Sequence, residues 1–285
     1  MYFVGVTTAQ SAIRRIFPEW CRVAGCPGLE LIGVDLPVGA PPGAYRDALE
    51  RMLADPDSRG ALVTTHKVAV VDYAADLISS LDAAGRRLGE VNCIVQRDGV
   101  LSGCALDFET SGEALDAIVD PKGRDVLIFG AGGAGTALAL NLKERGNAGE
   151  VIATDVNPAR LEQITRLTGA RTILAGAPSD NDAALGKMRS GSIIVNATGM
   201  GKDLPGSPIT AAAKFPEGAV AWDFNYRGDL KFLEYADKGG ATTADGWDYF
   251  IRGWTGVMAR VLDFALTAER MKAFRDIAAA ERPLK

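Results

Sequence analysis

The chain of 285 residues contains little of what a metal site with nitrogen and sulfur ligands requires. Its one histidine is His66, and its four cysteines, Cys21, Cys26, Cys93 and Cys104, show no C-x-x-C spacing. Because zinc sites need such residues in closely spaced groups, we expect no metal. We expect the cysteines to be small core residues in a reducing compartment rather than redox centres.

Basic tracts and long apolar runs are also missing. The net charge is −5, and no segment interleaves basic with aromatic residues, so we expect no nucleic-acid partner. No apolar stretch is long enough to span a bilayer, and the first residues lack the features of a signal peptide. We therefore expect a cytoplasmic protein with no membrane partner. These features leave open whether it is a monomer or a homodimer.

Hydrophobic residues make up 47% of the chain and charged residues 24%, which is ordinary for a globular protein. The length suits two domains. Short apolar segments alternate with helical patterns, which predicts an α/β fold with buried parallel strands. The expected strands cover residues 2–6, 29–35, 60–64, 91–96, 100–103, 126–129, 151–154, 171–174, 193–196 and 219–224. The expected helices cover residues 11–24, 45–54, 111–118, 136–145, 181–189, 230–238 and 247–282.

The most informative stretch spans residues 125–155. A short apolar segment, typical of a buried strand, is followed by a G-x-G-x-x-G pattern with Gly130, Gly132 and Gly135. The first glycine permits a tight turn, the second a close approach of a pyrophosphate, and the third a close contact between helix and sheet. A second short strand ends at Asp155, where a ribose-binding carboxylate is expected. This order predicts a Rossmann-type dinucleotide-binding unit, with a purely structural glycine turn as the alternative.

Asp155 also discriminates between the two nicotinamide cofactors. Its carboxylate can accept hydrogen bonds from ribose hydroxyls, but it repels a 2′-phosphate. Val156 supplies no cation that would offset this repulsion. We therefore predict NAD as the cofactor rather than NADP.

Seven segments, in order along the chain, carry a family resemblance. They are residues 5–11 (GVTTAQS), 63–67 (VTTHK), 89–92 (GEVN), 99–107 (GVLSG and a final Asp), 196–198 (NAT), 223–226 (D-x-x-Y) and 245–246 (DG). Together they resemble the shikimate/quinate dehydrogenase family over nearly the whole chain. The resemblance implies reversible hydride transfer between a ring alcohol and the nicotinamide.

The resemblance also implies the domain organisation. It predicts an α/β substrate-binding and catalytic domain over residues 1–107 and a Rossmann-type NAD-binding domain over residues 108–246. The final helices, in residues 247–285, are then expected to pack back on the substrate domain.

Carried over to this chain, the resemblance assigns Lys67 and Asp107 as the catalytic pair. Oxidation of a secondary alcohol requires a group that accepts the hydroxyl proton as the hydride leaves. A lysine near a carboxylate can relay that proton or stabilise the developing alkoxide. The alternative is a surface ion pair, which is disfavoured because Lys67 follows a predicted strand directly.

Five residues are predicted to bind the substrate, and four of them have a structural alternative. Asn92 would bind substrate hydroxyls or serve as a turn residue, and Ser11 would hold a substrate carboxylate or cap a helix. Tyr226 would reach the substrate or pack as a half-buried aromatic residue. His66 would bind a hydroxyl or relay a proton, against a structural role. Thr64, in the second of the seven segments, completes the set.

The predicted cofactor-binding residues come from three places: the stretch at residues 125–155, the small-residue loop that follows residues 193–196, and the last two family segments. They are Gly130, Gly132, Gly133, Ala134, Gly135, Asp155, Thr198, Gly199, Met200, Phe224 and Gly246.

The chain departs from the family where shikimate would be bound. Ile13 stands where the family has a second serine for the carboxylate, and Arg14 follows where proline is usual. Leu106 replaces the threonine of the N-T-D block, and Gly253 replaces a glutamine. The segment at 63–67 is also one residue short and lacks its proline. Because a site without partners for a substrate's hydroxyls binds that substrate poorly, we expect weak binding of shikimate itself.

The predicted function is hydride transfer between NAD and a secondary hydroxyl of a shikimate/quinate-like ring. One rival is a dehydrogenase of another cyclitol or sugar-like alcohol on the same scaffold. The other rival is an NAD-binding sensor without turnover, which the retained Lys67 and Asp107 disfavour. Arg14 and Arg15 are either replacement contacts for a substrate carboxylate or exposed helix residues.

Overall fold

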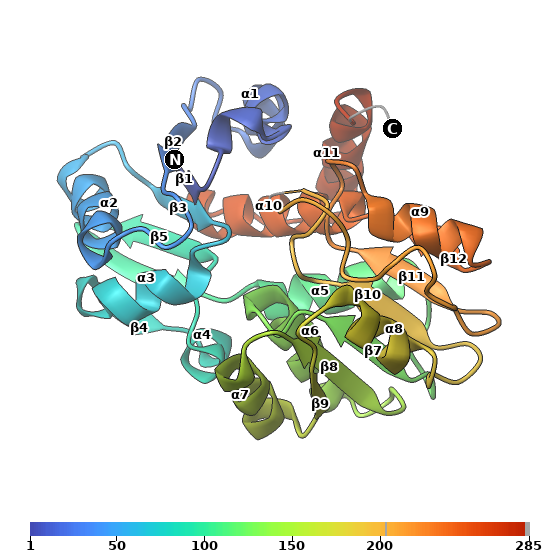
Figure 1. Ribbon diagram of the computed structural model, residues 1–285. Helices are drawn as coiled ribbons and strands as arrows, with labels where there is room; N and C mark the ends of the chain where they lie inside the picture. Colours follow the sequence, from blue (N-terminus) through green and yellow to red (C-terminus); the bar gives the residue numbers. More distant parts are fainter. Residues whose placement is uncertain (203, 283–285) are drawn as a thin grey trace. The chain divides into compact units, whose positions relative to one another are not determined.

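The computed structural model describes residues 1–202 and 204–282 and divides into two compact units (Figure 1). Among the described residues, the first unit combines 1–106 with 251–282, and the second contains 107–202 and 204–250. The last three residues of the predicted C-terminal segment, 283–285, lie outside the described part. Within the described part, no helix is both long and apolar enough to cross a bilayer.

The first unit is built on a six-stranded mixed sheet in the order β2-β1-β3-β5-β6-β4. Strands β2, β1 and β3 are parallel, whereas β5 runs antiparallel to both β3 and β6. The predicted hairpin turn is confirmed, because Asp98 and Gly99 have φ values of 51° and 75°, as a type I′ turn requires. The strands are β1 (Tyr2–Gly5), β2 (Ile32–Asp35), β3 (Gly60–Val63), β4 (Ile78–Leu81), β5 (Cys93–Arg97) and β6 (Val100–Cys104).

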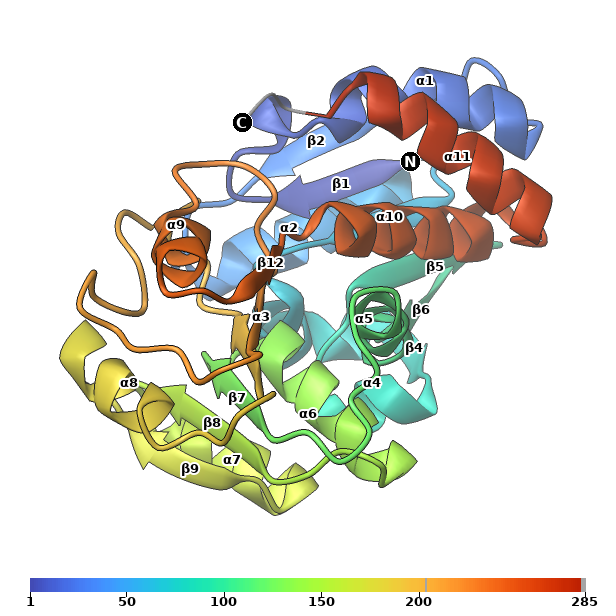
Figure 2. The same ribbon diagram turned by 90° about the vertical axis from the view of Figure 1, so that its right-hand side faces the viewer.

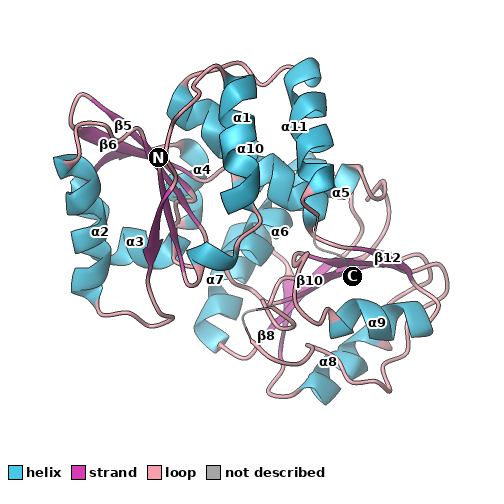
Figure 3. Cartoon of the chain, turned by 90° about the horizontal axis from the view of Figure 1, so that it is seen from above, coloured by secondary structure: helices cyan, strands magenta, loops and turns pink. Residues whose placement is uncertain are grey.

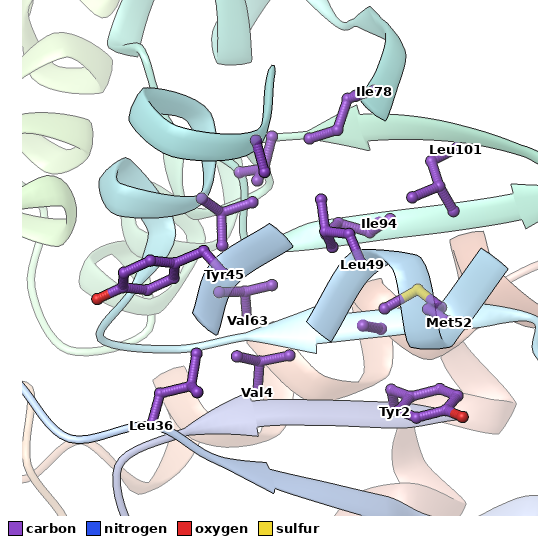
Figure 4. Packing of buried hydrophobic residues seen from close by; sticks show 14 of the residues in the cluster. Tyr2, Val4, Leu36, Tyr45, Leu49, Met52, Val63, Ile78, Ile94 and Leu101 are labelled. Carbon is purple, nitrogen blue, oxygen red and sulfur yellow. The ribbon is translucent and has the colours of Figure 1, made fainter. Parts of the chain in front are cut away.

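One face of this sheet is covered by α2 (Pro42–Ala54) and α3 (Lys67–Ala74). Figure 4 shows Leu49 and Met52 of α2 packed over the inward side chains of the strands, among them Val63. Leu49 and Met52 are both 0% exposed, so this face is a closed apolar core.

The other face is covered by α1 (Ile13–Ala24), by the part of α10 (Trp247–Leu262) that belongs to this unit, and by α11 (Ala268–Ala280) (Figure 2). The rings of Phe3 and Trp254 meet edge to face at 4.8 Å. Trp20 lies 5.3 Å from the ring of Phe274 and donates its Nε1–H to the Phe274 carbonyl at 2.9 Å. The expected return of the C-terminal helices to the first unit is therefore confirmed.

The helical pattern predicted over residues 247–282 forms two helices, with one interruption. Helix α10 ends at Leu262, Asp263 has a φ of 57°, and Thr267 caps α11 by accepting a hydrogen bond from the Arg270 N–H. A left-handed residue interrupts the helical ladder, and the capped restart directs α11 onto α1.

The second unit is a doubly wound parallel sheet in the order β12-β11-β10-β7-β8-β9, which confirms the predicted Rossmann-type fold. Helices α5, α6 and α7 cover one face, and α8 and α9 cover the other (Figure 3). The central strands β7, β10 and β11 are buried along their whole length, as their apolar sequences predict. The elements are α5 (Asp107–Asp116), β7 (Val126–Phe129), α6 (Gly133–Arg145), β8 (Val151–Asp155), α7 (Pro158–Thr168), β9 (Arg171–Leu174), α8 (Pro178–Leu185), β10 (Ile193–Asn196), β11 (Val220–Asp223), α9 (Lys231–Lys238) and β12 (Thr242–Ala244).

Several elements were not predicted, most of them short. They are α3, β4, α4 (Ala83–Leu88), α7, β12 and two 3-10 turns at Thr8–Gln10 and Ala75–Leu77. Strands β4 and β12 are short edge strands with exposed positions, so their apolar signal is weak. Helices α3 and α4 have only eight and six residues, too few for a clear amphipathic pattern.

Replacing Phe274 with alanine should destabilise the first unit by about 3–5 kcal/mol, because it removes a fully buried ring packed on Trp20. Urea unfolding followed by tryptophan fluorescence measures the loss. The matched control is Lys272→Ala on the exposed side of α11, whose exposed ion pair with Asp276 should contribute less than about 1 kcal/mol. Equal effects of both changes would show that α11 does not depend on this contact.

Candidate active site

The glycine-rich loop joins β7 to α6, and two of its glycines tolerate no side chain. A Cβ on Gly135 would lie 2.1 Å from the Gly130 carbonyl oxygen, and a Cβ on Gly130 would lie 2.9 Å from the carbonyl carbon of Ala197. Gly130 also has a φ of 99°, which favours glycine. The first turn of α6, with Gly133 and Ala134, therefore begins close to the strand end and offers its N–H groups to an anion.

Asp155 ends β8, as predicted, and its carboxylate lies against the same loop. One oxygen accepts the Ala131 N–H at 2.8 Å, and the other accepts the Asn157 N–H at 2.8 Å. Asp155 is 9% exposed, so part of the carboxylate stays accessible, whereas the adjacent Val156 is 72% exposed and carries no charge. The carboxylate thus ties β8 to the glycine-rich loop, and each oxygen keeps a lone pair for a ribose hydroxyl.

Arg160, in the first turn of α7, is a candidate cofactor residue that the sequence reasoning missed. Its Nη1 lies 3.9 Å from the position of a Cβ on Gly132, which otherwise faces open space. A cation therefore lies near the loop even though the neighbour of Asp155, Val156, supplies none. Only the helical geometry of α7, which begins at Pro158 after an Asn157 cap, turns this side chain toward Gly132.

The loop that follows β10 packs directly on the glycine-rich loop. The Ala197 N–H donates to the Phe129 carbonyl at 2.8 Å, and a Cβ on Gly135 would lie 3.3 Å from that of Ala197. Thr198 and Met200 are held by hydrogen bonds within this loop, and Gly199 has a φ of 77°. The predicted residues of the nicotinamide side are therefore next to the predicted pyrophosphate site.

Phe224, just after β11, and Gly246, just after β12, join this group. A Cβ on Gly246 would lie 2.0 Å from the Phe224 carbonyl oxygen, and the Gly246 N–H donates to the Asn225 carbonyl at 2.9 Å. The Phe224 ring packs on Trp222 at 4.5 Å and on Tyr249 at 4.7 Å. Residues at the carboxyl ends of β7, β8, β10 and β11 therefore form one polar surface, where open parallel sheets bind their ligands.

In the first unit, Asn92 connects the segments that carry the predicted catalytic pair. Its Oδ1 accepts the Leu106 N–H at 2.8 Å, its carbonyl accepts the Val63 N–H at 2.9 Å, and it is 3% exposed. Its neighbour Val91 donates its N–H to the Lys67 carbonyl at 3.1 Å. Asp107 follows Leu106 directly, begins α5 and is 4% exposed.

Thr64 and Ser11 also lie in the first unit. The Thr64 hydroxyl donates to the Val4 carbonyl at 3.3 Å, and Thr64 is half-buried just beyond β3. Ser11 is 7% exposed and does not cap α1, because Ala12 occupies the cap position without a side-chain bond. The helix-cap alternative for Ser11 is therefore wrong, and its substrate role stays a prediction.

His66 is only 3% exposed, and both of its ring nitrogens lie near protein groups. Nε2 lies 2.9 Å from the Leu36 carbonyl, and Nδ1 lies 3.4 Å from the Tyr45 hydroxyl. Because a carbonyl only accepts, Nε2 must carry the proton. Burial lowers the pKa of His66, although the bond to the Leu36 carbonyl opposes this shift. These contacts favour the structural alternative over a substrate contact.

Tyr226 packs against two other aromatic rings. It lies 5.0 Å from the ring of Trp247 and 4.5 Å from that of Phe250. The ring is half-buried, so the contacts support the packing role, and the role of its phenol in substrate binding stays a prediction.

The two arginines that were considered for a substrate carboxylate have other contacts. Arg14 donates to the Leu31 carbonyl at 2.6 Å, and Arg15 pairs with Glu281 of the first unit at 2.5 Å. These contacts favour structural roles for both residues.

The three positions that depart from the family differ in their surroundings. Ile13 is 0% exposed and Leu106 is 7% exposed, so both side chains are in the core. Gly253, by contrast, has no atom within 4 Å of the position of a Cβ. Open space therefore takes the place of the family's glutamine at position 253, whereas apolar side chains fill the other two positions.

A buried carboxylate near Asn92 was also missed. Glu90 is 0% exposed and precedes Val91, which bonds to Lys67. A glutamate inside an apolar segment is the signal that the sequence offers, because charged side chains are rarely buried without a function or a partner.

A hollow in the second unit has a volume of about 850 Å³ and is lined by Lys122, Arg124, Asp125 and Arg189, among others. It lies at the amino end of β7 and β10. None of the predicted site residues lines it, and ligands of parallel sheets bind at the opposite end.

Comparison with known proteins identifies the family. The shikimate dehydrogenase (NADP(+)) of Moorella thermoacetica is 32% identical over 239 residues, which span 74% of this chain and 76% of the relative. The chain belongs to the shikimate dehydrogenase family. The matching relatives make it an oxidoreductase with a nicotinamide dinucleotide cofactor. No model of a protein family matches the chain.

Solved structures share the fold of the family over almost the whole chain. The shikimate 5-dehydrogenase of Thermus thermophilus, solved with NADP(H) and shikimate, gives a TM-score of 0.74 at 25% identity and covers 97% of this chain and 98% of that one. A ligand-free 5-ketofructose reductase of a Gluconobacter species gives a TM-score of 0.68 at 22% identity and covers 97% and 98%. The second likeness shows the fold alone.

His66 should make the first unit sensitive to acid. Below about pH 6.5 the unfolded chain takes up a proton that the buried folded imidazole resists, so the free energy of unfolding falls as the pH falls. In His66→Gln, which can still donate to the Leu36 carbonyl, this contribution is absent. Urea unfolding at about pH 8 and about pH 5 should show that the stability advantage of the unmodified protein narrows in acid. A constant difference between the two proteins would contradict the neutral, buried state of His66.

Proposed function

We propose that the chain is an NAD-dependent dehydrogenase that acts reversibly on a secondary hydroxyl of a shikimate/quinate-like hydroxylated ring. The observation that carries the proposal is the series of hydrogen bonds around Asn92, in a chain that belongs to the shikimate dehydrogenase family. The bonds run from the backbone of Lys67 through Val91 and Asn92 to Leu106, the residue before Asp107.

The residues of the second unit fit a dinucleotide. The cradle around Gly132 is open, the first turn of α6 offers N–H groups, and Asp155 keeps acceptor capacity for a ribose. Bound NAD supplies the hydride acceptor for the oxidation. The curated relatives are named for NADP(+), but the charge at Asp155 and the uncharged Val156 favour NAD in this chain. Arg160, beside Gly132, is then a partner for the pyrophosphate that both cofactors share.

Lys67 and Asp107 would handle the proton of the substrate hydroxyl. The Lys67 ammonium would stabilise the alkoxide that develops as the hydride departs, or would pass one of its own protons to Asp107 as it takes up the hydroxyl proton. Asp107 would also orient the lysine and favour its ammonium form. Asn92 would orient both segments and bind a ring hydroxyl with its amide.

The substrate would be a ring that differs from shikimate. Ile13 and Leu106 are apolar core residues, so they give no polar contact to a carboxylate or a hydroxyl. The open space at Gly253 admits a group that a glutamine would exclude. The 5-ketofructose reductase has this fold, which keeps a sugar-like alcohol as the second candidate substrate.

A sensor that binds NAD without turnover is the candidate from another class. The presence of both Lys67 and Asp107 favours the enzyme. A panel of ring and sugar alcohols assayed with NAD separates the two functions, because a sensor binds NADH and turns over none of them.

Val156→Arg should shift cofactor preference toward NADP. The exposed side chain can place a guanidinium where a 2′-phosphate would sit beside Asp155, and a charge-assisted hydrogen bond of this kind is worth about 1.5–3 kcal/mol, or roughly ten-fold or more in Kd. Fluorescence titration with NADH and NADPH gives both values of Kd. Val156→Gln is the matched control, because it has similar reach and no charge. Tighter binding of NADPH than of NADH by the unmodified protein would refute the NAD assignment.

Lys67→Met should lower turnover by roughly 10²–10⁴-fold on the substrate identified in the panel, because it removes the ammonium and keeps most of the stem. The Kd for NADH should not change. Asp107→Asn should also slow turnover, and the double variant should lose less than the product of the two effects. Lys187→Met, an exposed lysine of the second unit, is the control. Full activity in Lys67→Met would remove Lys67 from the chemical step.

A further inference from the structure

Asp223 is a carboxylate in an unusual place, at the last position of β11 with 0% of its surface exposed. One of its oxygens accepts the Asn225 N–H at 2.8 Å, and the other accepts the Asn196 side-chain amide at 3.0 Å. Asn196 is also 0% exposed and ends the neighbouring strand β10. A buried carboxyl therefore joins the ends of two central strands.

The Asn196 amide in turn holds the loop at residues 196–200. Its Oδ1 accepts two hydrogen bonds from Thr198, one from the N–H at 3.1 Å and one from the hydroxyl at 2.7 Å. The Thr198 hydroxyl accepts the Met200 N–H at 3.1 Å. The Met200 carbonyl accepts from the amides of both Asn196, at 3.3 Å, and Asn225, at 3.0 Å. The conformation of the loop thus depends on which way the Asn196 amide points.

An ionised carboxylate can only accept hydrogen bonds, so it determines this orientation. With Asp223 as its partner, Asn196 must turn its NH₂ group toward β11 and its oxygen toward Thr198. An amide or hydroxyl at position 223 could donate as well as accept, and would permit the reversed orientation. The acceptor-only character of Asp223 therefore selects one conformation of the loop.

This arrangement is costly for the fold. Burial raises the pKa of Asp223 to about 7, against the opposing effect of the bonds from Asn225 and Asn196, and Asp245 raises it further. A buried charge with only neutral donors around it is expensive, and an apolar residue would pack at lower cost. Such a cost is typical of a residue that serves the site.

We propose that Asp223 is a positioning residue that fixes the loop at 196–200 for the nicotinamide half of the cofactor. The inference rests on the proposed function, because it requires that this loop faces the nicotinamide. Ala197 of the loop packs on Gly130 and Gly135, so a change in the loop conformation alters the packing next to the dinucleotide site.

The test compares NADH with ADP-ribose, which has the same adenine, pyrophosphate and riboses and lacks only the nicotinamide. Affinities are measured by fluorescence titration and calorimetry at about pH 8.5, where Asp223 is ionised. In Asp223→Asn the Kd for NADH should rise about ten-fold, because a donor then faces the Asn196 amide. The Kd for ADP-ribose should change by less than about two-fold.

Asp125→Asn is the matched control. Asp125 is also a buried carboxylate, 7% exposed, but it directly precedes the amino end of β7, at the opposite end of the strands of the same sheet. It accepts hydrogen bonds from Arg189 and from the Glu150 N–H. The Asp125→Asn variant should be less stable in thermal unfolding, and its Kd values for NADH and for ADP-ribose should change by the same factor. A swapped pair, Asn196→Asp with Asp223→Asn, restores a donor opposite an acceptor and should recover part of the NADH affinity.

Two outcomes overturn the inference: an unchanged Kd for NADH in Asp223→Asn, or equal weakening of NADH and ADP-ribose. Failure of dinucleotide binding, the part of the proposed function on which the inference rests, has a different signature, because the unmodified protein would then bind neither ligand. A loss of stability alone, with both affinities retained, would make Asp223 structural and would also overturn the inference.

Discussion

The contact on which the second unit depends is the approach of α6 to the end of β7, and it exists only because two residues lack a Cβ. A methyl group on Gly135 would lie 2.1 Å from the Gly130 carbonyl oxygen, well inside van der Waals contact. Without this approach the N-terminus of α6 would stand away from the sheet, and neither Ala197 nor the Asp155 carboxylate would meet the loop. The steric constraint therefore precedes the electrostatics of the site, because it brings the polar groups together.

The first unit depends on a polar contact in the corresponding place. Asn92 accepts the N–H groups of Val63 and Leu106 with its two oxygens, and so ties the end of β3 to the hairpin that precedes Asp107. Loops at a sheet end have few other backbone partners, so a buried amide can hold them where an apolar residue could not. The predicted role of Asn92 in substrate binding is thus built on a structural role, and the two are not alternatives.

Each unit has a buried polar group at or just beyond the end of a strand. His66 is held neutral between Leu36 and Tyr45 in one unit, and Asp223 is held between two asparagines in the other. Burial disfavours the charged form of both groups. It therefore lowers the pKa of His66 and raises the pKa of Asp223. Acid therefore costs the first unit stability, whereas a rise in pH from about 4 to about 7 costs the second, because the unfolded carboxyl of Asp223 loses its proton before the folded one. Polar groups of this kind give the loops one conformation at the expense of stability.

The sequence by itself determined the α/β class and the Rossmann-type unit, because both depend on local periodicity or on fixed spacing, and its family resemblance supplied the catalytic candidates. Strands β7, β9 and β10 were predicted to the residue, and Asp155 was found from its distance to the glycines. Tertiary structure alone decided where side chains point. It broke the C-terminal helix at Asp263, turned Arg160 toward Gly132, and enclosed His66 and Ile13. These outcomes depend on neighbours distant in the sequence, and no local pattern carries that information.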